Sequence, residues 1–81
     1  MTEERLFTFP STRAAIAGEK ALLAAGISAM VMPMPEALSA DCGIVLRVSP
    51  PELIAARAAL DTAGVEIRCI YRKYGDEVVP L

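Results

Sequence analysis

An internal repeat constrains the fold of this chain more than any other feature. The segments ALLAAGISAMVM (residues 21–32) and ALDTAGVEIRCI (residues 59–70) both run from a helix end through Ala-Gly into a β-rich stretch. Each half of the 81-residue chain therefore reads as strand–helix–strand. Two such halves in series have the β-α-β-β-α-β order of ferredoxin-like folds. The sequence thus predicts an α+β fold with a four-stranded antiparallel sheet of order 4-1-3-2 and two helices on one face.

Four short β-rich stretches predict the strands. Each carries β-branched, aromatic or other apolar residues and is bounded by proline, glycine or polar residues. The tail after the last stretch, residues 72–81, contains VVPL and could fold back as a short extra strand. The four predicted strands are Arg5–Phe9, Ile27–Met32, Gly43–Val48 and Val65–Tyr71.

Two alanine-rich stretches predict the helices. The first, Arg13–Ala25, follows the N-cap residues Ser11 and Thr12 and stops at Gly26. The second begins at SPPE (residues 49–52), where serine would act as N-cap and glutamate would complete a capping box. Apolar residues at the spacing of an amphipathic helix form its core-facing stripe: Leu53, Ala56, Leu60 and Ala63. Gly64 ends this helix.

Length and composition predict one ferredoxin-like domain over residues 1–81, with a core at about 4–72 and a tail at 73–81. The chain is 54% hydrophobic and has a net charge of −2 without a basic stripe, so nucleic acid is not an expected partner. No apolar run approaches the roughly 18 residues of a membrane span. The opening MTEERLF does not resemble a secretory leader. These features predict a cytoplasmic protein with no membrane association.

The chain has two cysteines and no histidine. This excludes the usual zinc spacings and any Ser–His or Cys–His catalytic pair, so no metal and no cofactor is expected. Cys69 alternates with Val65 and Ile67 on a predicted strand, which predicts a small buried residue. The predicted sheet order also places Cys69 and Cys42 beyond the reach of a disulfide.

The stretch MPMPEALSADCG (residues 32–43) forms a long connection between two predicted strands, and such connections tend to be functional. In the predicted topology it lies at the end of the sheet where the first helix begins. The helix dipole and Arg13 would then lower the pKa of the Cys42 thiol, while Asp41 would raise it. Gly43 leaves the backbone beside that thiol open. Alternatively, Cys42 packs under the loop as an inert thiol.

Several of these residues together resemble a known family over about residues 5–72. The matching pieces are FPST (9–12), EKAL (19–22), AGI (25–27), Pro33, Pro35, LS (38–39), CG (42–43), GVE (64–66) and IY (70–71). The chain resembles the small bacterial and archaeal domain named putative selenium/sulfur carrier protein-like. Two positions depart from the family pattern: Glu36 stands where arginine is common, and Arg13 where histidine is frequent.

The resemblance implies that Cys42 carries sulfur or selenium as a persulfide or perselenide between donor and acceptor proteins. It implies a thiol carrier more than a turnover enzyme. Supporting residues would be Gly43, Ser11, Thr12, Arg13, Glu19 and Ser39; plain helix capping and a structural glutamate are the alternatives for Ser11, Thr12 and Glu19. The methionines Met30, Met32 and Met34 either form a docking surface or belong to the sheet core. A second hypothesis is a non-catalytic module that binds a small effector or a partner. The open sheet face could also take a second copy of the chain.

Overall fold

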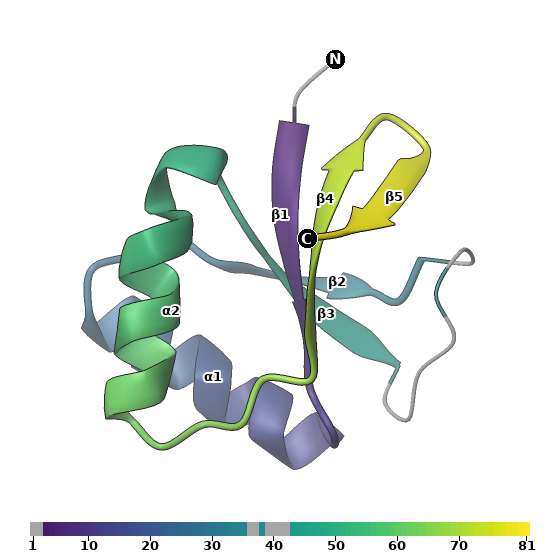
Figure 1. Cartoon of the computed structure of the whole chain (residues 1–81). Helices are drawn as coiled ribbons and strands as arrows, with labels where there is room; N and C mark the ends of the chain where they lie inside the picture. The colour runs from purple at the N-terminus through teal and green to yellow at the C-terminus, as the bar shows by residue number, and fades with distance from the viewer. Residues whose placement is uncertain (1–2, 36–37, 39–42) are drawn as a thin grey trace.

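The computed structural model describes residues 3–35, 38 and 43–81. Both helices lie on one side of an antiparallel sheet, and the two chain ends leave from β1 and β5 (Figure 1). The predicted α+β class is therefore confirmed. In chain order, the elements are β1 (Glu3–Thr8), α1 (Thr12–Ala24), β2 (Met30–Pro33), β3 (Ile44–Val48), the 3-10 turn η1 (Pro50–Glu52), α2 (Leu53–Thr62), β4 (Cys69–Tyr74) and β5 (Glu77–Pro80).

The sheet has five strands in the order β2-β3-β1-β4-β5. The predicted four-stranded sheet of order 4-1-3-2 is therefore wrong, because a fifth strand, β5, lies beside β4. The added strand β5 pairs antiparallel with β4 across Gly75-Asp76. Gly75 has φ +60°. A positive φ at the first of two loop residues is typical of type II′ hairpin turns, which match the twist of the flanking strands. The tail thus closes onto the β4 edge.

Helix α1 begins and ends where its capping residues predict. The Ala14 amide donates to Ser11 Oγ at 3.1 Å. Gly26 follows the last turn with φ +77°, a conformation that glycine adopts without a steric penalty. Because these caps are local, they could be identified from the sequence alone.

The start of α2 differs from the predicted capping box. Residues Pro50–Glu52 form a 3-10 turn, and Ser49 makes no side-chain bond to the backbone of this turn. Its hydroxyl donates instead to Glu52 Oε1 at 2.9 Å. The two consecutive prolines lack amide donors, so the first turn offers fewer N–H groups for a serine to cap. Ser49 therefore stands at the predicted N-cap position, but its side chain does not make the predicted capping bond.

The main core lies between the helices and the sheet. It combines aromatic residues of the β1 end with leucines of β3 and both helices. Strand residues reach it from alternate positions, as a two-residue strand period requires. Its fully buried members include Phe7, Phe9, Ala15, Leu22, Leu46, Ala56 and Leu60.

The sheet face opposite the helices has a closed apolar centre. Leu6 and Val45 lie on this face and are only 2% and 0% exposed. Beside them, Glu4 pairs with Arg47 Nη1 at 2.9 Å and with Lys73 Nζ at 3.7 Å, which links three strands. Little apolar surface is therefore exposed at the centre of this face.

Candidate thiol site

The first turn of α1 presents the predicted anion-stabilising groups. Ser11 is the N-cap, and Thr12 and Arg13 are both exposed to solvent. The first amides of a helix have no intrahelical acceptor, and the helix dipole makes this end positive. No acidic residue stands in the first turn of α1 to oppose that field. The geometry of this turn suits a nearby thiolate or another small anion.

The described ends of the long loop lie at the same end of the sheet as this helix start. Met34 donates its amide to the Gly43 carbonyl at 2.8 Å, which closes the β2–β3 ladder. Strand β3 pairs antiparallel with β1, with Phe7 opposite Leu46, so the start of β3 adjoins the end of β1. Gly43 is exposed, and a Cβ there would have no heavy atom within 4 Å among the described residues, its chain neighbours aside. Cys42 and Ser39, the other predicted residues of this loop, lie outside the described residues.

Glu19 does not join the helix start. It lies eight residues after Ser11, which corresponds to about 12 Å along a helix axis. Arg47 of β3 is not its partner among the described ion pairs, since Arg47 Nη1 lies 2.9 Å from Glu4 Oε2. Glu19 is half-buried, and its support of the Cys42 thiol stays a prediction because Cys42 lies outside the described residues.

Cys69 is exposed, so the prediction of a buried residue is wrong. The strand starts at Cys69, and residues 65–68 before it are irregular. Val65 and Ile67 pack against the core, but the next residue to do so is Ile70. The alternation therefore slips by one position between Ile67 and Ile70, and Cys69 turns to the opposite face.

Two hydrogen bonds to Thr8 accompany this shift in the alternation of the side chains. Its carbonyl accepts the Arg68 amide at 2.8 Å, while its hydroxyl accepts the Cys69 amide at 3.1 Å. Two successive residues thus bond to one, as in a β-bulge, which rotates the following side chains. The only signal for this in the sequence is a threonine opposite the strand start, and that opposition is known only after the strands are paired.

The exposed thiol has a tyrosine neighbour. Cys69 and Tyr71 lie two positions apart on β4 and share one face. A hydrogen bond between their side chains is the main factor that raises the pKa of Tyr71. Burial and the negative charge of the Cys69 thiolate also raise it, while Arg68 lowers it. Cys69 is thus an exposed thiol with a neighbouring tyrosine, which the sequence did not indicate.

Cys69→Ala is expected to lower the pKa of Tyr71 toward 10.0, because it removes the largest factor that raises it. The measurement is an absorbance titration of the phenolate. A Tyr74→Phe background leaves Tyr71 as the only tyrosine signal, since the chain has two tyrosines. Because folding raises the pKa of Tyr71, its neutral form contributes stability below pH 10.0 that is lost as the pH rises through the folded-state value. An unchanged midpoint would show that the two side chains do not interact.

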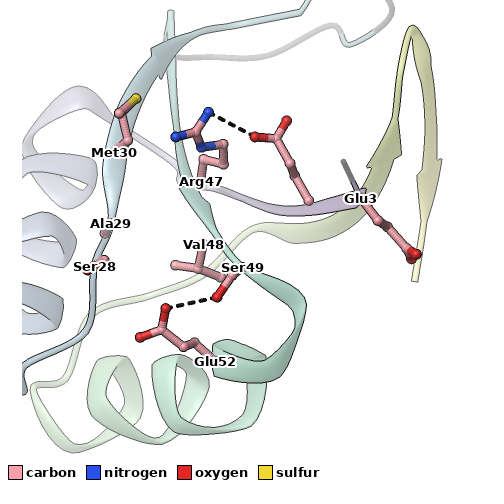
Figure 2. A pocket seen from close by; sticks show the side chains of 9 residues that line it. Glu3, Ser28, Ala29, Met30, Arg47, Val48, Ser49 and Glu52 are labelled. Atoms are coloured by element: carbon pink, nitrogen blue, oxygen red, sulfur yellow. Dashed lines mark hydrogen bonds and ion pairs between the residues drawn. The ribbon is translucent and has the colours of Figure 1, made fainter. Parts of the chain in front are cut away.

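A separate hollow lies at the other end of the sheet (Figure 2). It has a volume of about 430 Å³ and is lined by strand ends, by Met30 and by the η1 region. Two polar pairs, Arg47–Glu4 and Ser49–Glu52, are drawn at its wall. The end of β3 lies roughly 16 Å from Gly43 at the usual rise per strand residue. The described lining contains none of the predicted site residues.

A comparison of the sequence with protein families finds a match. The family described as "Putative Se/S carrier protein-like" matches residues 4–72. The chain belongs to this family. The suspected resemblance is thereby confirmed over β1 to the middle of β4, a range that contains both Cys42 and Cys69. Strand β5 lies beyond the matched range of the Se/S carrier-like family. Comparisons with curated proteins and with solved structures find no match.

Within the described residues, neither helix is long and apolar enough to cross a membrane.

Proposed function

We propose that this protein carries sulfur or selenium on the Cys42 thiol and passes it between partner proteins in the cytoplasm. The observation that carries the proposal is membership of the Se/S carrier-like family over residues 4–72, which include the Cys42-Gly43 pair. The chain also keeps the β-α-β-β-α-β succession through β4, and we assign it to the ferredoxin-like arrangement with one added strand.

The proposed transfer needs only one nucleophilic sulfur. The Cys42 thiolate attacks the outer sulfur of a donor persulfide, R–S–SH. A new S–S bond forms on Cys42, the donor S–S bond breaks, and the donor leaves as a thiolate. The outer proton stays with the transferred sulfur or passes to solvent, and no external oxidant is consumed. A donor carrying R–S–SeH would load selenium in the same way.

The described surroundings of the loop support this assignment. The β1–β3 register brings the loop ends beside the start of α1. The exposed Arg13 and the uncapped amides of the first turn would stabilise both a thiolate and the negatively charged persulfide. Gly43 leaves space for the sulfur of a partner protein to approach. No histidine base is required, which agrees with a chain that has none.

The test is intact-mass spectrometry of the reduced protein after incubation with a persulfide donor. Wild type is expected to gain the mass of one sulfur atom, and Cys42→Ala is expected to lose this gain. Cys69→Ala is the matched control because it removes the other thiol of the chain. It should load as wild type does.

The exposure of Cys69 makes this control decisive. If Cys69→Ala abolished loading while Cys42→Ala retained it, the carrier residue would be Cys69. If no donor loaded any variant, the protein would be better described as a binding module without carrier chemistry. A selenium donor tests the second chalcogen on the same two variants.

A further inference from the structure

Helix α1 and the edge strand β2 expose several large apolar side chains. The described chain exposes seven large hydrophobic residues, and four of them come from α1 and β2. On α1, Ile16 is 46% exposed and Leu23 is 55% exposed. On β2, Met30 is 50% exposed and Val31 is 39% exposed. The two elements are separated in sequence only by the turn at residues 25–29.

The helical wheel places Ile16 and Leu23 on the β2 side of α1. Successive residues turn by about 100°. The buried Ala15 and Leu22 mark the face toward the sheet, while the half-buried Ala21 lines the groove toward α2. Ile16 and Leu23 therefore project away from α2. Helix α2 lies beside β4, because its residues Leu53 and Arg57 line the same hollow as Ile70. Strands β4 and β2 lie on opposite sides of the sheet centre, so the side of α1 away from α2 is the β2 side.

Strand β2 presents backbone groups outward on that same side. It is the last strand of the described sheet and pairs only with β3. Met34 donates to the Gly43 carbonyl, and antiparallel ladders alternate, so Met32 and Met30 also direct their backbone groups toward β3. Val31 consequently directs its N–H and C=O away from β3. Pro33 lacks a backbone N–H, but at its position this group would point away from β3, as is usual for a proline in an edge strand.

The α1 flank is complementary to a rotated copy of itself. Its residues read Ile16, Glu19, Lys20 and Leu23, at three-, one- and three-residue intervals. In an antiparallel pair centred between Glu19 and Lys20, Ile16 lies opposite Leu23 of the second copy, and Glu19 lies opposite its Lys20. Apolar residues then meet apolar residues, and each acidic residue meets a basic one. This pattern selects a second copy over an unrelated strand or helix.

We propose that this flank, defined by Ile16, Glu19, Lys20, Leu23 and Val31, binds a second copy of the chain about a two-fold axis perpendicular to the sheet. The axis passes Val31, so the two β2 strands pair antiparallel and the sheet continues across the dimer. The same rotation makes the two α1 helices antiparallel, as their charge pattern requires. A C2 interface is self-complementary by definition. The opposite sheet face is a weaker choice because Leu6 and Val45 are already buried within one chain.

The proposal is tested by exchanging the charges of Glu19 and Lys20 and measuring the oligomeric state by sedimentation. Protein concentrations from about 10 μM to about 1 mM cover the range in which a modest interface forms a dimer. Wild type should shift from monomer to dimer as concentration rises. Lys20→Glu or Glu19→Lys alone places like charges opposite one another twice per dimer. Each should raise the dissociation constant by about tenfold. The double variant Glu19→Lys/Lys20→Glu restores opposite charges and should restore dimerisation.

Val31→Pro tests the strand edge, because it removes an outward N–H and no β2–β3 bond. It should reduce dimerisation while the monomer keeps its circular dichroism spectrum and its urea midpoint. Wild type that remains monomeric at all concentrations would overturn the proposal. So would a dimer that neither single charge variant weakens, or one that the double variant fails to restore. These outcomes do not depend on whether Cys42 carries sulfur.

Discussion

Phe9→Ala is expected to lower the free energy of unfolding by about 3–5 kcal/mol, the usual range for deleting a buried aromatic ring. Phe9 is 0% exposed and packs at the junction of β1 and α1 within the main core. Small domains have total stabilities of about 5–15 kcal/mol, so this loss would remove a large part of the folding free energy. Urea unfolding followed by circular dichroism measures it directly.

Ile54→Ala is the matched control for this truncation. Ile54 is a large apolar residue, but it is 83% exposed on α2. Its replacement should change the stability by no more than about 0.5 kcal/mol. A Phe9→Ala protein that unfolded at the wild-type midpoint would show that the ring does not fill the core. A changed slope with denaturant would instead indicate an altered unfolded state.

Gly18→Leu is expected to destabilise the protein by roughly 2–3 kcal/mol through overpacking. A Cβ on Gly18 would lie 3.1 Å from two ring atoms of Phe9 and 3.3 Å from Leu46 Cδ1. A single methyl at those distances already requires small shifts, and a leucine side chain needs volume that the core lacks. The helix-propensity gain of about 1 kcal/mol from replacing glycine offsets only part of this cost.

Ala17→Leu is the control for Gly18→Leu, because Ala17 is the preceding residue of the same helix and is exposed. It should leave the free energy of unfolding nearly unchanged. Combining Gly18→Ala with Phe9→Leu tests the contact itself, since the smaller side chain vacates the space that the methyl needs. If the two effects simply added, the ring and the helix would not be in contact.

Different observations draw attention to each of the two thiols of this protein. Cys42 lies within the residues matched by the family and belongs to a loop whose described ends adjoin a helix start. Cys69 has solvent exposure and a tyrosine whose pKa it raises. Labelling experiments on wild type alone would therefore mix two signals. Single-cysteine variants are needed before any modification is assigned to Cys42 or to Cys69.

Local sequence signals predicted most of the elements. Ser11 capping α1 and Gly26 and Gly64 following the helices depend only on nearby residues, so the sequence is sufficient to identify them. The internal repeat predicted the order of strands and helices through β4 for the same reason. The Phe-Pro-Ser-Thr and Cys-Gly pieces also identified the family, which matches residues 4–72.

Tertiary contacts decided the features that local patterns could not. The face of Cys69 depends on Thr8, which lies 61 residues away in sequence and bonds to both Arg68 and Cys69. The tail sequence indicated a fifth strand only as one possibility, and its formation depends on a free β4 edge beside which Val78 and Val79 pair. A strand period specifies alternation but not its phase, because a single bulge reverses every following side chain. The phase is set only when the strands pair, and it is this pairing that brings the second thiol to the surface.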